Sequence, residues 1–207
     1  MDAQREQLEA QIRQAWSAGD FPGATTHALR GYGPEVLGFL FATQRGVDLA
    51  EQAFSLFAEH LWQGMPRFEW KSSVRTWSYV LARHASIDVL RGEARHQRGR
   101  APFDADPVAE VAAVVRTATL SLLRTEPRDA FARLRDELPE EDRLLLILRV
   151  DRELDWREIA SVLGSASEGT SESDAQIARE SARLRKRFQL LKERLRALGK
   201  QRGLTGA

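Results

Sequence analysis

Residues 67–91 read RFEWKSSVRTWSYVLARHASIDVLR, and the rest of the chain is best understood from this stretch. Its first part alternates aromatic with charged residues, which is typical of a loop. Ser72 and Ser73 then supply side chains that can cap a helix whose apolar and basic residues fall on different faces. The sequence therefore predicts a short aromatic and basic loop followed by an amphipathic helix.

This combination suits the capture of an unpaired nucleobase. Proteins that hold a splayed-out base supply aromatic rings for stacking and Arg or Lys for the phosphates. Phe68 and Trp70 in the loop are the stronger stacking candidates. Trp77 lies three residues after Val74 and four before Leu81, the spacing of a buried core residue. The basic candidates are Arg67, Lys71, Arg75, Arg83 and Arg91.

A family resemblance is carried by residues of this stretch, namely Phe68, Ser73, Arg75, Thr76, Trp77, Tyr79, Ala82, Arg83, Asp88, Leu90 and Arg91. In this order they resemble the promoter-melting segment of the extracytoplasmic-function (ECF) sigma factors of bacterial RNA polymerase. There the segment belongs to sigma region two, whose loop and following helix recognise and help to open the minus-ten promoter element. The resemblance implies minus-ten contacts by Arg67, Phe68, Trp70, Lys71, Arg75, Arg83 and Arg91. One position departs from the family, which usually has Asn where this chain has His84.

The composition excludes several classes of protein. The chain has 207 residues, 43% hydrophobic and 29% charged, enough for one or two small domains. It contains no cysteine, so disulfides, thiolate zinc sites and cysteine catalysis are excluded, and its 4 histidines are scattered. No apolar run reaches the length of a membrane span and no signal stretch opens the chain. We therefore expect a cytoplasmic protein without a cofactor, a metal site or membrane insertion.

The formal net charge of +1 conceals an uneven distribution. Basic side chains far outnumber acidic ones in residues 175–202, whereas acidic side chains outnumber arginines in residues 104–142. A basic end suits a polyanion, although charge runs are usually only solvated faces. Nucleic acid binding is thus one interpretation of this end, and a solvated helix is the other.

The pattern upstream of the loop predicts several packing helices. Residues 1–18 form the first, stopped by Gly19, and a second runs towards Gly31. Pro34 is expected to start a third, at a position where its missing amide proton costs nothing. Gly46 ends that helix.

The helix after Gly46 carries the next family feature. Asp48 and Glu51 have the spacing of a capping box. In ECF sigma factors the equivalent helix opens with an Asp-Ala-Glu-Asp pattern, continues to a Gln and docks on the polymerase clamp. This chain matches with Asp48, Ala50, Glu51 and Trp62, while Gln52 and Ser55 replace the usual Asp and Gln. The resemblance implies polymerase binding through Asp48, Glu51, Gln52 and Ser55.

A linker is predicted after residue 92. Gly, Pro and Arg are frequent up to Pro107, which indicates a linker over residues 93–126. Within it, residues 108–123 have the periodicity of a helix. In the family this linker threads near the active-site cleft and the RNA exit path of the polymerase. We expect sigma region two over residues 1–92 and a second domain over residues 127–207.

The second domain resembles sigma region four, a helix-turn-helix domain that recognises the minus-thirty-five element. Leu138 and Pro139 precede acidic residues and a leucine-rich helix, as at the start of that region. Asp155 and Glu158 form a capping box, and the helix that they open is closed by Gly164. This helix matches the first helix of a helix-turn-helix.

A long basic helix ends the chain. Residues 165–174 are a polar, flexible insertion where the family has a turn of about four residues. The apolar stripe after it predicts a helix that is buried on one side; its members are Ile177, Leu184, Phe188, Leu191, Leu195 and Leu198. The other faces carry the expected minus-thirty-five contacts Arg183, Arg185, Lys186 and Arg187. We expect them to contact mainly phosphates rather than base edges.

The sequence thus predicts an all-α protein of two small helical domains joined by a partly flexible linker, acting as an ECF-type sigma factor and not as an enzyme. The implied partners are promoter DNA, the clamp and flap surfaces of core RNA polymerase, and an anti-sigma factor. Two alternatives stay open. A helix-turn-helix regulator that acts without polymerase gives no purpose to Phe68 and Trp70. The other alternative is a sigma-like helical adaptor that binds other proteins. It is supported by the departures from the family at Gln52, Ser55 and His84.

Overall fold

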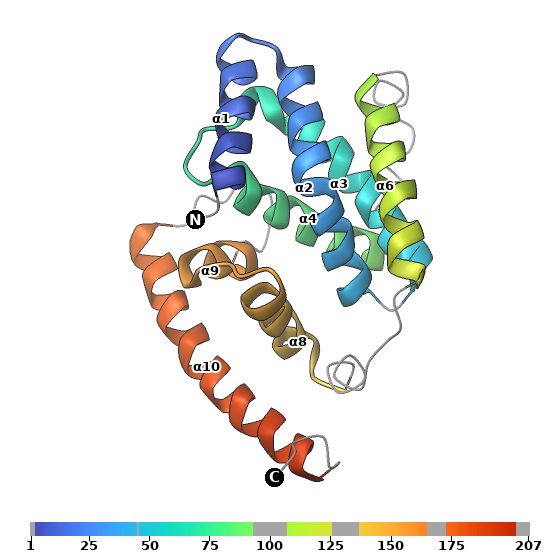
Figure 1. Ribbon diagram of the computed structural model, residues 1–207. Helices are drawn as coiled ribbons and strands as arrows, with labels where there is room; N and C mark the ends of the chain where they lie inside the picture. Colours follow the sequence, from blue (N-terminus) through green and yellow to red (C-terminus); the bar gives the residue numbers. More distant parts are fainter. Residues whose placement is uncertain (1–2, 45, 93–106, 126–136, 165–172, 202–207) are drawn as a thin grey trace. The chain divides into compact units, whose positions relative to one another are not determined.

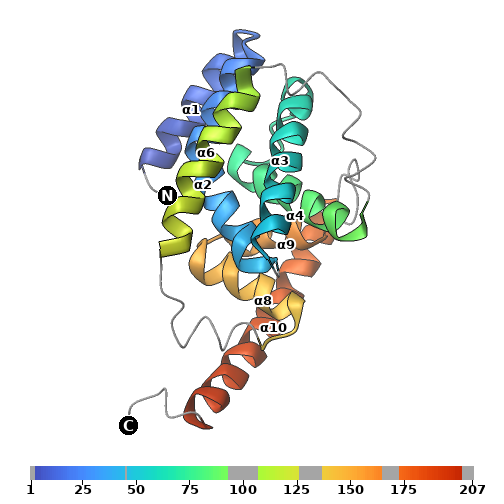
Figure 2. The ribbon, with the colours of Figure 1, turned by 90° about the vertical axis from the view of Figure 1, so that its right-hand side faces the viewer.

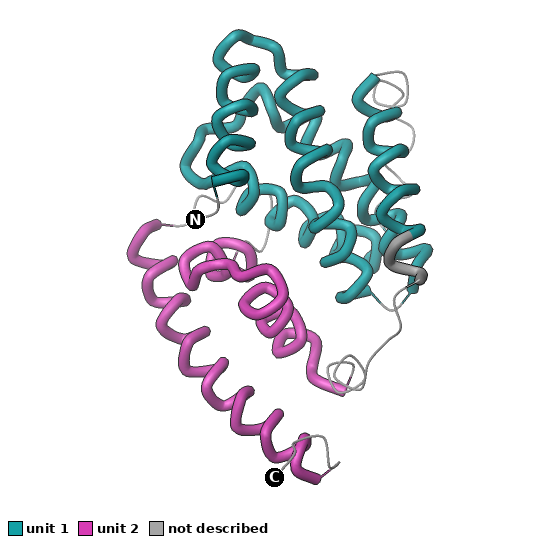
Figure 3. Tube along the Cα trace, in the orientation of Figure 1, with its two compact units in different colours: residues 1–124 teal, residues 125–207 magenta. Residues whose placement is uncertain are grey.

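The computed structural model describes residues 3–44, 46–92, 107–125, 137–164 and 173–201. These ranges contain helices, turns and loops and no β-strand, so the predicted all-α class is confirmed. The helices are α1 (Ala3–Ser17), α2 (Phe21–Thr43), α3 (Val47–Gly64), η1 (Met65–Arg67), α4 (Val74–Arg91), α6 (Pro107–Thr125), α8 (Glu140–Leu146), η2 (Ile147–Asp151), α9 (Trp156–Gly164) and α10 (Asp174–Gln201) (Figure 1). The chain divides into two compact units, residues 1–124 and 125–207 (Figure 3). None of the described helices is long and apolar enough to cross a membrane.

The first two helices pack against each other along their length (Figure 1). α1 ends just before Gly19, whose φ of 76° is readily adopted only by glycine, so the predicted stop is confirmed. α2 continues without interruption through Pro34, so the predicted break between two helices there is wrong. Proline removes one helical hydrogen bond. Residues on both sides of it, such as Leu29 and Val36, are fully buried, and their packing holds the helix together.

α6 lies along α2 and α3 in the first unit (Figures 1 and 2). At the crossing, a Cβ atom on Gly33 of α2 would lie 2.8 Å from Cγ1 of Val115 and 3.6 Å from Cζ of Phe54. Only glycine permits this close approach. The helix predicted inside the linker is therefore present, and its buried side, including Val108 and Leu120, packs on the first unit.

α3 and α4 complete the core of the first unit. Phe54 and Phe57 of α3 are buried with Tyr79 of α4, whose ring meets that of Phe39 edge-on at 5.4 Å. The predicted capping box at the start of α3 is wrong. The residue before the helix is Gly46, no side chain caps the first turn, and Asp48 lies inside that turn. Its carboxylate is still favoured there by the helix dipole.

α4 is capped at both ends. Ser73 precedes the helix, and its Oγ accepts a hydrogen bond from the amide of Thr76 at 3.0 Å, as the sequence predicts. At the other end Gly92 has a φ of 76°, and its amide donates to the carbonyl of Val89 at 3.1 Å. The caps fix where the loop ends and where the helix begins.

The second unit is a small helical cluster. α8 runs into the π-helical turn η2, and α9 and α10 pack together beside them. The predicted capping box of α9 is confirmed, because the amide of Asp155 donates to Glu158 Oε2 at 2.8 Å and the amide of Glu158 donates to Asp155 Oδ1 at 2.9 Å. Leu184 and Leu191 of the predicted stripe are buried in α10.

A further cap opens α10. The amide of Ser173 donates to Gln176 Oε1 at 2.8 Å, and the amide of Gln176 donates to Ser173 Oγ at 3.3 Å. This reciprocal pair has the Ser-x-x-Gln spacing of a capping box. This cap was not predicted from the sequence. Of the predicted insertion, residues 165–172 lie outside the described residues.

Candidate nucleic-acid interface

The loop between η1 and α4 holds a cluster of aromatic rings. Phe68 is 8% exposed, and its ring stacks on Trp77 with centroids 4.5 Å apart and planes 24° apart. Trp70 meets Phe68 edge-on at 5.0 Å. One predicted stacking residue is therefore buried, and a base reaches Phe68 only if the ring leaves Trp77.

Trp70 is held in an unusual backbone conformation. Its φ of 57° lies in the left-handed region, which costs a non-glycine residue of order 1 kcal/mol or more. The half-buried ring contacts Trp16 edge-on at 5.7 Å, and the guanidinium carbon of Arg13 lies 4.3 Å from the ring centroid. Its Nε1 atom is buried without a hydrogen-bond partner among the described residues. The second predicted stacking residue is thus positioned by two side chains of α1.

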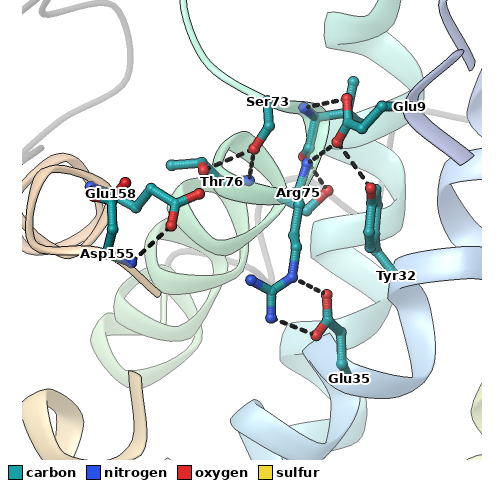
Figure 4. A network of polar contacts seen from close by, with 10 residues as sticks. Glu9, Tyr32, Glu35, Ser73, Arg75, Thr76, Asp155 and Glu158 are labelled. Atoms are coloured by element: carbon teal, nitrogen blue, oxygen red, sulfur yellow. Dashed lines mark hydrogen bonds and ion pairs between the residues drawn. The ribbon is translucent and has the colours of Figure 1, made fainter. Parts of the chain in front are cut away.

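Glu9 of α1 caps the start of α4 (Figure 4). Its carboxylate accepts hydrogen bonds from the amides of Val74 at 3.1 Å and Arg75 at 3.0 Å, and from the hydroxyl of Tyr32 at 2.8 Å. A negative charge at a helix N-terminus is favoured by the helix dipole. Burial and the neighbouring Glu9 carboxylate raise the pKa of Tyr32 well above its ordinary value.

Arg75 is paired inside the first unit. Its Nε and Nη2 atoms donate to the two carboxylate oxygens of Glu35 at 2.8 and 2.9 Å, and its side chain is 7% exposed (Figure 4). The guanidinium also lies over the ring of Tyr79 at 5.6 Å. In this conformation Arg75 ties α4 to α2, and a DNA contact would require it to leave Glu35.

The other predicted minus-ten cations lie closer to solvent. Arg67, Lys71 and Arg91 are exposed and Arg83 is half-buried, whereas His84, which replaces the family's Asn, is 6% exposed. Lys71 pairs with Glu69 at 2.5 Å, and both side chains are about two-thirds exposed. Surface pairs of this kind contribute little to stability, so Lys71 can exchange its partner at little cost.

The predicted polymerase-binding residues share one side of α3. They are Asp48, Glu51, Gln52 and Ser55, a spacing that places them on one face of a helix. Asp48 and Ser55 are exposed, and the two between them are half-buried. Ser55 Oγ donates to the carbonyl of Glu51 at 3.0 Å and accepts from Nη1 of Arg116 in α6 at 3.0 Å. One end of this face is therefore contacted by α6.

The predicted minus-thirty-five cations behave differently from one another. Arg183, Arg185 and Lys186 are exposed on α10. Arg187 instead donates from Nε to Asp142 Oδ1 at 2.6 Å and from Nη1 to Glu141 Oε2. Partial burial lowers the pKa of Arg187, but the hydrogen bonds to Asp142 and Glu141 and the charges of these carboxylates together raise it by more, so the group stays charged. Arg187 joins α10 to α8.

Sequence reasoning missed the contribution of α1, which it treated as an ordinary packing helix. Glu9, Arg13 and Trp16 all contact the loop or the start of α4. Their spacing of four and three residues puts them on one helix face. This spacing can be read from the sequence, and it could have indicated a shared contact surface. Within the described residues, no group of three or more His, Cys, Asp or Glu side chains is arranged to hold a metal ion.

Comparison with known proteins identifies the family. The family model described as Sigma-70 region 2 matches residues 29–96, which include α3, the aromatic loop and α4. The chain is also similar to RNA polymerase sigma factor YlaC of Bacillus subtilis (strain 168), with 30% identity over 144 residues, 65% of this chain and 76% of that protein. No solved structure matches the chain. The predicted resemblance to ECF sigma factors is confirmed, and the chain belongs to the sigma-70 family of RNA polymerase sigma factors.

Proposed function

We propose that the first unit binds and helps to open the minus-ten promoter element, while the second unit binds the minus-thirty-five element. As a sigma factor the protein acts in transcription initiation with RNA polymerase and is not an enzyme. The observation that carries the finer assignment is the loop before α4, where Phe68 and Trp70 lie together within the matched residues 29–96. Aromatic rings beside cations are the groups that hold unpaired bases.

The exposure of the side chains supports some of the proposed minus-ten contacts more directly than others. Arg67, Lys71 and Arg91 present charge to solvent, and such groups can neutralise phosphates without breaking a buried contact, since the pair of Lys71 with Glu69 is exposed. Phe68 and Arg75 are held by Trp77 and Glu35 in the described conformation, so their use requires a rearrangement of the loop. Sigma region two over residues 1–92, the linker over 93–126 and region four over 127–207 form the proposed division.

The minus-thirty-five assignment draws support from α10. Arg183, Arg185 and Lys186 form an exposed basic cluster on a helix whose opposite side packs through Leu184 and Leu191. Arginine and lysine side chains bind phosphates along the duplex, and arginine can also read guanine edges. We expect phosphate contacts to dominate. Arg187 has a structural role instead, because it joins α10 to α8.

Polymerase binding is proposed on the exposed face of α3. Asp48, Glu51, Gln52 and Ser55 would dock on the clamp, and the second unit on the flap. The hydrogen bond from Arg116 to Ser55 has to break or be shared when a partner covers this end of the face. An anti-sigma factor acting on the same face and a location in the cytoplasm complete the proposal.

Abortive transcription tests this function. The full chain is combined with purified core RNA polymerase on a library of promoter fragments, supplied both as duplexes and with a pre-melted bubble. We expect short transcripts only when the protein is present. Trp70→Ala should lower transcription from duplex templates while the complex with core polymerase persists. Loss of that complex would make Trp70 structural or interfacial, and association without transcription from any template would favour the adaptor alternative.

A further inference from the structure

Three side chains of α1 converge on the loop that precedes α4. Glu9 accepts hydrogen bonds from the amides of Val74 and Arg75, and Trp16 Nε1 donates to the carbonyl of Met65 at 2.8 Å. Between these two anchors, Arg13 places its guanidinium over the ring of Trp70 at 4.3 Å. α1 therefore holds η1 before the loop, the start of α4 after it, and one ring within the loop. The helix lies outside the residues matched by the family model.

The order of the rings determines what an incoming base meets. Phe68 is buried against Trp77, so its face is not open. Trp70 is half-buried, with Phe68 and Trp16 packed edge-on against it and Arg13 over its ring. Arg13 itself is exposed. On the side of the ring that Arg13 covers, the outermost flat group of the cluster is thus a guanidinium.

A guanidinium backed by an indole ring is suited to one kind of ligand. Its planar surface stacks on aromatic rings, and its N–H groups bind phosphate or base edges at the same time. The cation–π contact with Trp70 limits the orientations of the side chain. An acidic peptide would use only the charge, whereas an unpaired nucleotide uses both the charge and the flat surface.

We propose that an unpaired nucleotide of the melted promoter strand stacks on Arg13, and that Trp16 is a positioning residue that holds the loop for this contact. This rests on the proposed minus-ten function of the loop and adds α1 to the site. The left-handed backbone of Trp70 fits the same arrangement, because a strained residue persists only where its surroundings hold it.

Binding of a single strand to the assembled complex tests the proposal. The probe is a fluorescent oligonucleotide with the non-template sequence of a promoter bubble that supports transcription, added to the full chain bound to core polymerase. Arg13→Ala should weaken binding by about tenfold, the size expected for one base stack. It should also make the salt dependence shallower, because one fewer counterion is released. Arg13→Lys should keep the salt dependence and recover only part of the affinity.

Two further variants separate contact from positioning. Arg5→Ala removes the same charge from the same helix about 12 Å away, and it should leave affinity nearly unchanged. Trp16→Phe keeps an aromatic ring but removes the hydrogen bond to Met65. It should weaken binding without changing the salt dependence, since no phosphate contact is lost.

The results distinguish the proposed role of Arg13 from the proposed minus-ten function of the loop. If Trp70→Ala loses affinity while Arg13→Ala binds as well as Arg5→Ala, Arg13 has no role in the site. If Arg13→Lys binds as tightly as the natural chain, Arg13 supplies only charge and the stacking proposal is wrong. If Trp70→Ala and Arg13→Ala both keep full affinity, the minus-ten assignment of the loop itself is wrong.

Discussion

Arg75 of the first unit and Arg185 of the second, both predicted DNA-binding residues, are held in different ways. In the first unit Arg75 is nearly buried and forms a two-point contact with Glu35. In the second unit Arg185 is exposed on α10, and Arg183 makes only a long contact of 3.4 Å with Glu180 one turn earlier. One arrangement fixes the start of a helix, and the other keeps charge on the surface.

The difference teaches that charge alone does not mark a DNA contact. A buried cation has lost its hydration and depends on its partner, so it cannot be given to a phosphate without a large cost. An exposed cation gives up little when it exchanges water or a counterion for a phosphate. Each unit contains both kinds. Arg67 and Arg91 are exposed in the first unit, and in the second unit Arg187 joins α10 to α8 much as Arg75 joins α4 to α2.

The largest effect is expected at the buried pair. Glu35→Ala leaves Arg75 without its carboxylate, and this should lower the free energy of unfolding by about 3 kcal/mol. Urea unfolding followed by tryptophan fluorescence measures it. Lys71→Ala, at the exposed pair with Glu69, is the control and should cost less than about 1 kcal/mol.

A double variant sharpens this test. Glu35→Leu combined with Arg75→Met replaces the pair by apolar side chains, which should restore most of the stability that Glu35→Ala loses. Equal costs for Glu35→Ala and Lys71→Ala would contradict the anchoring role of Arg75, and the contrast between the units would disappear.

A smaller effect is expected at the cap of α4. Glu9→Gln removes the charge and one of the acceptor oxygens that serve Val74, Arg75 and Tyr32, and should cost about 1 to 3 kcal/mol. Glu6→Gln, at an exposed position of the same helix, is the matched control. If both variants unfold at the same urea concentration, Glu9 is not a structural part of the loop.

Tyr32 gives the first unit a dependence on alkaline pH. Its pKa in the folded chain is raised above the ordinary 10.0 by burial and by Glu9. The folded state therefore keeps a proton that the unfolded state loses above about pH 10, and stability falls there by up to about 1.4 kcal/mol per pH unit. Tyr32→Phe should remove this contribution. Parallel unfolding curves at rising pH compare the two proteins, and identical losses would contradict the prediction.

The parts of the fold that could be predicted from the sequence are those set by short-range rules. Ser73 caps α4 and the Asp155–Glu158 pair caps α9, because the groups concerned lie only three residues apart. The helix start predicted at Pro34 and the capping box predicted at Asp48 are both wrong, because packing and not local sequence decides these two places. Buried neighbours carry α2 through Pro34, and α3 begins one residue before Asp48.

The sequence names the residues of the candidate site but does not predict what each of them contacts. Residue type and spacing identified Phe68, Trp70 and Arg75, but whether each is open to a ligand depends on partners far away in the chain. Arg75 meets Glu35 across 40 residues, and its amide meets Glu9 across 66. Such contacts arise only when the helices pack, so local periodicity cannot reveal them.

The smallest changes in stability are expected for the cations of α10, and they should differ between Arg187 and its neighbours. Arg187→Ala breaks the pairs of Arg187 with the exposed Glu141 and the half-buried Asp142 and should lower stability by about 1 kcal/mol. Arg185→Ala and Lys186→Ala should each change stability by no more than about 0.5 kcal/mol, as is usual for surface positions. Unfolding in urea measures these differences.

Binding to duplex promoter DNA should give the opposite ranking. Each of Arg185→Ala and Lys186→Ala should reduce the slope of log affinity against log salt by about 0.9 if its side chain contacts one phosphate. Arg187→Ala should leave that slope nearly unchanged, because its guanidinium is already occupied by Asp142 and Glu141. A slope that falls equally for Arg187→Ala would mean that Arg187 exchanges its carboxylates for phosphate on binding. The separation between structural and surface arginines would then hold for the first unit and fail for the second.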